Sequence, residues 1–284
     1  MKNASARTTY LKDYRPPPFT IETTDLHFDL YEDHALVVSK LFFKRNGDAA
    51  ADTLQLHGQL LQLEKLLING QQLESGQYLQ DDEGLTIPAL NELLGESFVE
   101  FRFECHTRIE PQNNTALEGL YKSKKMFCTQ CEAEGFRRIT YYLDRPDVMS
   151  VFTTTVVADK TKYPVLLSNG NNIASGEVDG APERHWVTWE DPFKKPSYLF
   201  ALVAGDLASL DDTFVTCSNR EIELRIFVEE KGIDKCDHAM LSLKNSMRWD
   251  EEVYGREYDL DIFMIVAVDD FNMGAMENKG LNVF

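Results

Sequence analysis

Cys128 and Cys131 are the most closely spaced thiols in the sequence, and their spacing is that of half a zinc site or of a redox pair. A structural zinc would need two further ligands nearby, whereas the other three cysteines, Cys105, Cys217 and Cys236, are scattered singly. A redox pair would lie between a strand and a helix of a βαβ unit, and the surrounding sequence shows no such unit. We therefore interpret both residues as ordinary reduced thiols, in keeping with an odd total of five cysteines.

The six histidines do not have the spacing of a catalytic zinc site. None is followed by glutamate, and none has a second histidine four residues later, so the His-Glu-x-x-His helix that binds zinc and supplies a general base is missing. The histidines are His27, His34, His57, His106, His185 and His238. We expect no metal ligand and no catalytic residue among these 284 residues.

Two segments combine carboxylates with amide, glycine and arginine residues. The first is Cys128-Thr-Gln-Cys-Glu-Ala-Glu-Gly-Phe-Arg-Arg138, followed closely by Tyr141-Tyr-Leu-Asp-Arg-Pro-Asp147. The second is Asp269-Asp-Phe-Asn-Met-Gly-Ala-Met-Glu-Asn-Lys-Gly280. Taken alone, a carboxylate such as Glu132 is more often a solvated loop residue than a ligand-binding one. Gln130 precedes it by two positions and would share its face if the segment were extended.

The acidic composition restricts the partners of the protein. With 47 acidic and 29 basic residues the net charge is −18, which repels nucleic acid and anionic lipid and favours cations such as a peptide's α-ammonium group. Much of this charge also serves solubility. The longest apolar run, residues 262–268, is far shorter than the roughly 20 residues of a transmembrane helix, and residues 1–18 lack the apolar core of a secretory signal. We therefore expect no transmembrane segment and a cytoplasmic location.

Strands are the elements that must position most of these residues. Residues 97–106 alternate apolar and polar side chains, as expected of a strand with one buried face. Two further segments repeat this alternation, with Leu26, Phe28 and Leu30, and with Phe152, Thr154 and Val156. Asn-Gly, Ser-Gly and Asp-Gly pairs separate such runs. Several short strands with frequent turns predict a β-sandwich or a saddle of packed sheets.

The pattern changes near Gly205. Residues 221–230 form a further alternating strand, and residues 260–268 are almost continuously apolar, which is typical of a strand buried on both faces. Between them, apolar residues recur at helical spacing: Ile233, Cys236, Met240, Leu243, Met247 and Tyr254. Asp234 suits the N-cap of this helix, and Gly255 should end it. The order strand, helix, strand predicts a second domain.

The two segments, in this order, resemble the M1 family of zinc aminopeptidases and specifically its bacterial aminopeptidase N branch. Other M1 members have a Pro-Cys-Phe-Asp-Glu-Pro type of stretch where this chain has Tyr142-Leu-Asp-Arg-Pro146, and the leukotriene hydrolase branch has Gly-Gly-Met-Glu-Asn where this chain has Gly274-Ala-Met-Glu-Asn278. The similarity runs along the whole chain. It implies a mainly β protein, with an N-terminal β-sandwich or saddle domain (residues 1–204) and the start of an α+β, thermolysin-like catalytic domain (residues 205–284), truncated before the zinc site.

The resemblance also implies roles for individual residues. Glu277 and Glu132 each match a family glutamate that binds the substrate's α-ammonium group, and Gln130 matches a position that lines the first pocket. A charge-assisted hydrogen bond of this kind contributes about 1.5–3 kcal/mol, so such carboxylates in a water-poor pocket would reject a mid-chain peptide bond.

The remaining motif residues also match substrate-binding positions. Gly274 and Ala275 match backbone that pairs with the substrate as an added strand, and glycine permits close approach. Met273 matches a flexible side chain that cushions the first substrate residue. Met276 and Asn278 complete the substrate-binding motif. The residues alone leave open that Gly274 only relieves a turn and that Met273 is a core residue.

For the intact protein, the resemblance implies an aminopeptidase that releases N-terminal amino acids from peptides by zinc-dependent hydrolysis with broad specificity. One Zn²⁺, its ligands, the general base and an oxyanion-stabilising tyrosine would follow position 284, so the fragment itself should be inactive. The expected substrates are peptides with a free N-terminus. A monomer is expected, with peripheral association with the inner membrane as an addition to the cytoplasmic location.

Two other functions fit parts of the sequence. A non-catalytic peptide-binding or scaffold module of M1-like fold would keep the substrate-gripping surface without zinc, and the sequence that follows Phe284 would discriminate between the two. A carbohydrate-binding β-sandwich would need exposed aromatic residues on one sheet face. Trp186 and Trp189 are three positions apart in an expected strand and should face opposite sides, which argues against that function.

Overall fold

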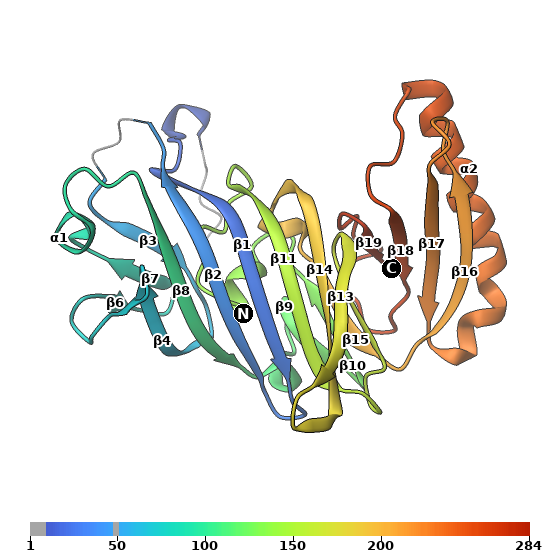
Figure 1. Cartoon of the computed structure of the whole chain (residues 1–284), viewed down its shortest axis with the longest axis horizontal. Coiled ribbons are helices and arrows are strands. Elements are labelled where there is room, and N and C mark those ends of the chain that lie inside the picture. Colours follow the sequence, from blue (N-terminus) through green and yellow to red (C-terminus); the bar gives the residue numbers. More distant parts are fainter. Residues whose placement is uncertain (1–9, 48–50) are drawn as a thin grey trace.

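Alternating side chains build a broad eight-stranded sheet, which forms the centre of the molecule (Figure 1). The computed structural model describes residues 10–47 and 51–284. The strands of the sheet, in spatial order, are β13 (Asn171–Val178), β14 (Ala181–Pro196), β11 (Met149–Asp159), β1 (Phe19–Leu30), β2 (Ala35–Arg45), β8 (Glu100–Ile109), β4 (Gln62–Ile68) and β5 (Gln71–Gln72). All neighbours are antiparallel except β1 and β11, which are parallel. The chain is mainly β, as predicted.

The alternation correctly predicts which side chains enter the core. Leu26, Phe28 and Leu30 of β1 are buried, as are Phe152, Thr154 and Val156 of β11. In the segment predicted as residues 97–106, the strand begins only at Glu100, and Val99 is 62% exposed. The predicted start is wrong because the chain arrives there from a turn at Gly95, with a φ of 89°, and the regular ladder with β2 begins at Glu100, after a single hydrogen bond from the N–H of Arg45 to the carbonyl of Val99.

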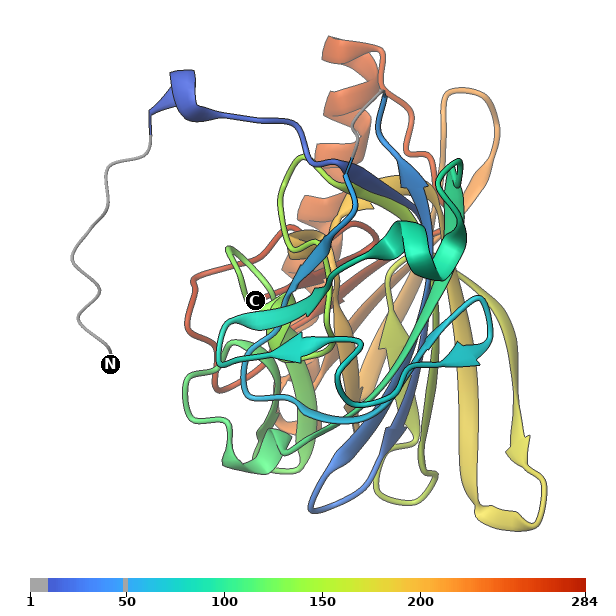
Figure 2. The same cartoon turned by 90° about the vertical axis from the view of Figure 1, so that its left-hand side faces the viewer.

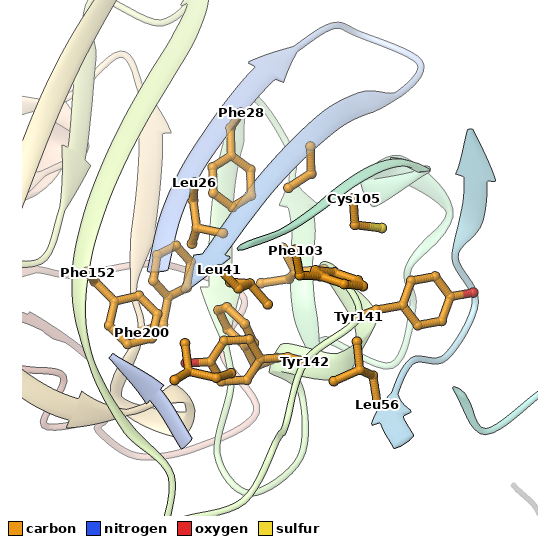
Figure 3. Close-up of a cluster of buried hydrophobic side chains, with 14 of the residues drawn as sticks. Leu26, Phe28, Leu41, Leu56, Phe103, Cys105, Tyr141, Tyr142, Phe152 and Phe200 are labelled. Carbon is orange, nitrogen blue, oxygen red and sulfur yellow. The ribbon is translucent and has the colours of Figure 1, made fainter. Parts of the chain in front are cut away.

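Two smaller sheets cover the inner face of the large sheet. One has the order β12 (Val165–Ser168), β15 (Leu202–Gly205), β10 (Met126–Gln130) and β9 (Gly119–Ser123); the other has β3 (Leu54–His57), β7 (Gly84–Ile87) and β6 (Leu79–Gln80). Phe28, Phe103, Phe152, Tyr142 and Phe200 meet between the layers in one apolar core (Figure 3). The packed sheets around this core form the saddle or sandwich that the sequence predicts.

Short helices connect the strands. They are α1 (Leu90–Leu94) and the 3-10 helices η1 (Leu11–Asp13), η2 (Pro111–Asn113), η3 (Phe136–Arg138), η4 (Ser197–Leu199) and η5 (Glu230–Lys235). The described lead-in from Tyr10 projects beyond the sheets before it enters β1 (Figure 2). Within the described residues no helix has the length and apolar character needed to cross a membrane.

A separate four-stranded sheet and one long helix form the C-terminal part of the chain (Figure 1). Its elements are β16 (Ala208–Val215), β17 (Glu221–Val228), α2 (Cys236–Tyr254), β18 (Ile262–Val266) and β19 (Leu281–Val283). Strands β17, β18 and β19 are parallel neighbours, and β16 is antiparallel to β17. The order strand, helix, strand agrees with the prediction. The predicted domain boundary, between residues 204 and 205, falls at the last residue of β15 and stays a prediction.

The long helix differs from the prediction at its start. Met240, Leu243 and Met247 are buried, and Gly255 ends the helix in the left-handed conformation, as predicted. Asp234 is not the N-cap: it lies inside η5, and Lys235 occupies the cap position without a side-chain hydrogen bond. The 3-10 turn precedes the helix directly, so its carbonyls replace the predicted cap.

Strand β18 joins the two parts of the molecule. Its residues Met264 and Val266 are buried against Tyr121 and Cys128 of the β9–β10 hairpin. On the other face, Phe263 and Ile265 are only partly buried and pack against residues of the α2 core, so the prediction of a strand fully buried on both faces is correct for one face only.

Candidate functional site

The segment between β18 and β19 contains most of the predicted substrate-binding residues and has no regular secondary structure apart from one bridge at Met276. Met276 donates to and accepts from the backbone of Val283, at N···O distances of 2.8 and 3.0 Å. Its side chain is buried. Met276 therefore attaches the motif to β19. Its backbone N–H and C=O groups are already paired within the chain.

The start of this segment is bound to the β9–β10 hairpin. The hydroxyl of Tyr121 donates to the carbonyl of Asp270 (2.9 Å), and the hydroxyl of Ser123 donates to the Asp270 carboxylate (2.7 Å). Two residues later, Nδ2 of Asn272 donates to the carbonyl of Leu117 (2.9 Å). The segment thus runs along β9 from its end towards its beginning.

The end of the segment is bound to a different part of the large β region. Nδ2 of Asn169, in the turn between β12 and β13, donates to the carbonyl of Lys279 (2.8 Å). Gly280 follows with a φ of +76°, and a Cβ there would lie 2.9 Å from Cδ1 of Leu260 and 3.2 Å from the backbone nitrogen of Gly170. A glycine is required at this contact. Residues 273–278 therefore lie between two attached points, Asn272 at the β9–β10 hairpin and Lys279 at Asn169.

The first carboxylate lies on a short turn directly after β10. Gln130 ends the strand, and Glu132 is the first of three exposed residues whose base is closed by a hydrogen bond from the N–H of Gly135 to the carbonyl of Cys131 (2.8 Å). The peptide bond between Glu132 and Ala133 is cis. A Cβ on Gly135 would lie 2.4 Å from the carbonyl oxygen of Gln130, so only glycine allows the turn to close so tightly.

Both carboxylate-bearing segments lie at the same end of the β9–β10 hairpin. In this hairpin Ser123 pairs with Met126 near the connecting turn, and Gly119 pairs with Gln130 at the opposite, open end. Because the second segment runs along β9 from Ser123 towards Leu117, it approaches the open end, which is also where Glu132 follows Gln130. The structure thus brings together two motifs that are far apart in the sequence.

Among the described residues of this region, Glu132 and Glu277 have neither a counter-charge nor a hydrogen bond to the side chain, whereas Asp270, also without a counter-charge, accepts a hydrogen bond from Ser123. Both side chains are exposed, and neither forms a hydrogen bond or an ion pair with any other residue within 10–47 and 51–284. Their neighbours are paired: Glu134 with Arg137 (3.1 Å), and Asp269 with Lys124 and Lys231. Hydrogen bonds from the two lysines lower the pKa of Asp269 to about 2. The exposure differs from the dry pocket expected for these carboxylates.

The two amide residues of the predicted site, Gln130 and Asn278, are buried. Gln130 and Asn278 are each 1% exposed, and Nε2 of Gln130 donates to the carbonyl of Glu132 at 3.4 Å. Oε1 of Gln130 and Oδ1 of Asn278 have no hydrogen-bond partner in the described part of the chain. Gln130 and Glu132 would share one face only in an extended segment, and this condition is not met, because β10 ends at Gln130 and the chain then turns.

Met273, Gly274 and Ala275 are exposed, as is Glu277, and Met273 is 44% exposed rather than a core residue. Gly274 does not have a positive φ, and a Cβ added to it would meet no atom within 4 Å. Neither the conformation nor the packing of this chain therefore requires glycine at position 274. The open space beside its backbone is available to a ligand.

The described residues do not fit a zinc ion. No group of three or more histidine, cysteine, aspartate or glutamate side chains comes close enough to ligate a metal within the described ranges. Cys128 and Cys131 are buried free thiols, and burial raises the pKa of Cys128 to about 12. This supports the interpretation of the pair as structural thiols.

The sequence patterns missed the residues that hold the two segments. Asn169 belongs to one of the Asn-Gly pairs that the sequence marks as turns, and its side chain also donates to the carbonyl of Lys279. Ser123 and Tyr121 lie on an ordinary-looking strand. Only the Asn-Gly signal marked any of them, because their partners are more than 100 residues away in the sequence.

Comparison with known proteins gives two family matches and several close relatives. The family model described as the Peptidase M1 N-terminal domain matches residues 21–199, and the one described as the Peptidase family M1 domain matches residues 238–284. The chain is 51% identical to the Aminopeptidase N of Haemophilus influenzae, over 98% of this chain and 31% of that protein, and 52% identical to that of Escherichia coli, over 97% and 30%.

A solved structure supports the same relationship. The crystal structure of Legionella pneumophila aminopeptidase A in complex with aspartic acid superposes with a TM-score of 0.90 and 34% sequence identity, and the match covers 97% of this chain and 32% of that one. The chain thus spans about a third of the length of these relatives.

Proposed function

The chain belongs to the M1 peptidase family, and from this membership we propose that it forms the site that recognises the substrate N-terminus in an aminopeptidase of about the length of its relatives. The proposal is supported by the two segments that carry Glu132 and Glu277, which both reach the open end of the β9–β10 hairpin, and by the exposure of both side chains, which have no internal partner in the described part of the chain. Two such carboxylates suit one α-ammonium group, which has three donors to share between them.

The backbone next to Glu277 supports recognition of a peptide rather than of a free amine alone. The open space beside Gly274 allows a ligand backbone to approach, and the exposed stretch through Ala275 offers N–H and C=O groups for pairing. Met273, exposed and flexible, is placed to contact the first side chain of the substrate. Such contacts depend little on the identity of the side chains and are compatible with broad specificity.

The hydrolytic chemistry lies outside these residues. The family resemblance implies Zn²⁺, and since the described residues do not gather its ligands, we assign no step of hydrolysis to them. In a whole protein their contribution is to bind and orient: the two carboxylates fix the amine, and the backbone of the second segment fixes the first peptide unit. A cytoplasmic, monomeric protein remains our expectation.

Kinetics of the whole protein test this function. We expect Glu132→Gln and Glu277→Gln each to lower kcat/KM for L-alanine p-nitroanilide by roughly 10- to 150-fold, since each removes a charge-assisted bond of about 1.5–3 kcal/mol. The matched control is Glu96→Gln, an exposed glutamate near α1, which should leave kcat/KM unchanged.

Two outcomes of these kinetics would contradict the proposed function. Wild-type efficiency in both variants would contradict the role assigned to the two carboxylates. A whole protein that binds free-amine peptides but does not cleave them would instead identify the peptide-binding scaffold.

A further inference from the structure

The turn that carries Glu132 rests on a buried ion pair. Nε of Arg137 donates to Oδ2 of Asp144 at 3.0 Å, the backbone N–H of Arg137 donates to the same oxygen at 3.2 Å, and Nη2 donates to the carbonyl of Asp144 at 3.2 Å. The other side of the guanidinium, Nη1, lies 3.1 Å from the carboxylate of Glu134. Arg137 therefore ties the exposed turn, through Glu134, to the interior.

The same carboxylate continues the contact towards the second segment. Oδ1 of Asp144 accepts a hydrogen bond of 2.6 Å from the hydroxyl of Ser197, the first residue of η4. At the other end of this short helix, the carbonyl of Leu199 accepts from Nδ2 of Asn169 at 3.0 Å. The same Nδ2 donates to Lys279, two residues after Glu277, and Oδ1 of Asn169 accepts from the N–H of Ala201 at 2.8 Å.

These contacts form one continuous chain between the two segments that carry Glu132 and Glu277. Its four side chains, Arg137, Asp144, Ser197 and Asn169, are 8%, 5%, 1% and 3% exposed. A buried ion pair rarely stabilises a fold more than apolar residues of the same size would, because desolvation offsets most of the attraction. Its directional hydrogen bonds, in contrast, fix the relative positions of the backbone segments that they join.

We propose that Arg137, Asp144, Ser197 and Asn169 are positioning residues that set the distance between Glu132 and Glu277. The proposal rests on the proposed function, because it assumes that the two carboxylates share one α-ammonium group. None of the four residues touches the ligand. Arg137 and Asp144 act through the turn closed by Cys131 and Gly135, and Asn169 acts through the carbonyl of Lys279.

The test measures inhibition constants of the whole protein for two ligands of the same shape, L-phenylalaninamide and 3-phenylpropanamide, which differ only in the α-amine. Asp144→Asn should weaken binding of the amine by roughly tenfold, since small displacements of a binding group are costly, and should leave the desamino ligand within about twofold. Asn169→Ser should act in the same direction. A general loss of folded protein would affect both ligands equally.

Double variants separate the two arms of the chain. The effect of Asp144→Asn should disappear in the Glu132→Gln background, and that of Asn169→Ser in the Glu277→Gln background, because a positioning residue has no effect once the group it positions is gone. Asp147→Asn is the matched control: it is the same chemical change three residues away, in an exposed pair with Arg145, and should leave both constants unchanged.

Each result supports or overturns the proposal. Equal losses for both ligands, or additive losses in the double variants, would overturn it. If Asp144→Asn does not fold, Ser197→Ala decides, since it removes only the donor to Asp144: a change of severalfold for the amine alone supports the proposal, and an unchanged ratio overturns it. If Glu132→Gln and Glu277→Gln themselves leave the preference for the amine intact, the proposed function fails.

Discussion

The segments that carry Glu132 and Glu277 both reach the open end of the β9–β10 hairpin, but they are supported in different ways. Glu132 is on a turn of three exposed residues whose base is buried and held by the Arg137–Asp144 pair. Glu277 is on a longer irregular segment that is anchored at its two ends by Ser123, Asn272 and Asn169 and bridged to β19 in between.

The positions of Glu132 and Glu277 therefore depend on different sets of contacts. The position of Glu132 depends on contacts within the N-terminal β region, so changes that disturb it should also reduce the stability of that region. The position of Glu277 depends on contacts between the two parts of the chain, and much of its segment makes few internal contacts. Changes there should affect ligand binding with little cost in stability.

The largest expected effect on stability is that of Arg137→Ala. It leaves the carboxylate of Asp144 buried without its cation, which should lower the free energy of unfolding by about 3–5 kcal/mol. Urea denaturation of the purified protein measures this. Arg145→Ala, in the neighbouring exposed pair with Asp147, should cost only about 0–1 kcal/mol. If both variants lowered the free energy of unfolding by only about 0–1 kcal/mol, the buried pair would not support the turn that carries Glu132.

Substitution of two glycines of the second segment by alanine should affect different properties, stability for Gly280 and activity for Gly274. Gly280→Ala forces a side chain into a φ of +76° at the anchor and should cost about 1–2 kcal/mol of stability. Gly274→Ala meets no atom of the chain and should change stability by less than about 0.5 kcal/mol, yet lower kcat/KM, because its methyl group occupies the space of the ligand backbone.

Thermal unfolding and kinetics of both glycine variants of the whole protein provide the measurement. A Gly274→Ala variant with full activity would show that the space beside position 274 is not used by the substrate.

The smallest expected effect is a dependence on pH. Burial, followed by the positive charge of Arg137, lowers the pKa of His57 from its usual 6.5, and Nδ1 of His57 accepts a hydrogen bond from the N–H of Asp144 at 3.2 Å. The unfolded chain therefore binds a proton at a higher pH than the folded one. The contribution of His57 to stability is complete above pH 6.5 and is lost as the pH falls towards the folded pKa.

Urea denaturation between pH 7 and pH 5 should show this loss in the wild type and less of it in His57→Asn, which retains an acceptor that does not titrate. The same slope in both proteins would contradict the role of His57. The second segment contains no histidine, so this dependence belongs to the support of Glu132 alone.

Local patterns predicted much of the fold, and the family motifs predicted the two carboxylates. Alternation correctly predicted the buried faces of β1, β11 and β17, since side-chain direction in a strand depends on the sequence itself. The two motifs resemble those of the M1 family, and this resemblance, rather than their composition, singled out Glu132 and Glu277.

The remaining features depend on partners distant in the sequence. Asn169 resembles any Asn-Gly turn until Lys279 is placed beside it, and Asp144 resembles a surface residue of a Leu-Asp-Arg-Pro stretch until it is found buried against Arg137 and Ser197. Asp234 was a plausible N-cap, but a preceding 3-10 turn displaced it. Such outcomes depend on tertiary contacts that no local pattern encodes.

The central claim is that Glu132 and Glu277 together bind one α-ammonium group. Calorimetric titration of the whole protein with L-phenylalaninamide and 3-phenylpropanamide tests it most directly, in the wild type and in the double variant Glu132→Gln/Glu277→Gln. We expect the wild type to prefer the amine by at least about tenfold, the equivalent of one charge-assisted hydrogen bond, and the double variant to bind both ligands equally. A double variant that keeps the wild-type preference would contradict the claim.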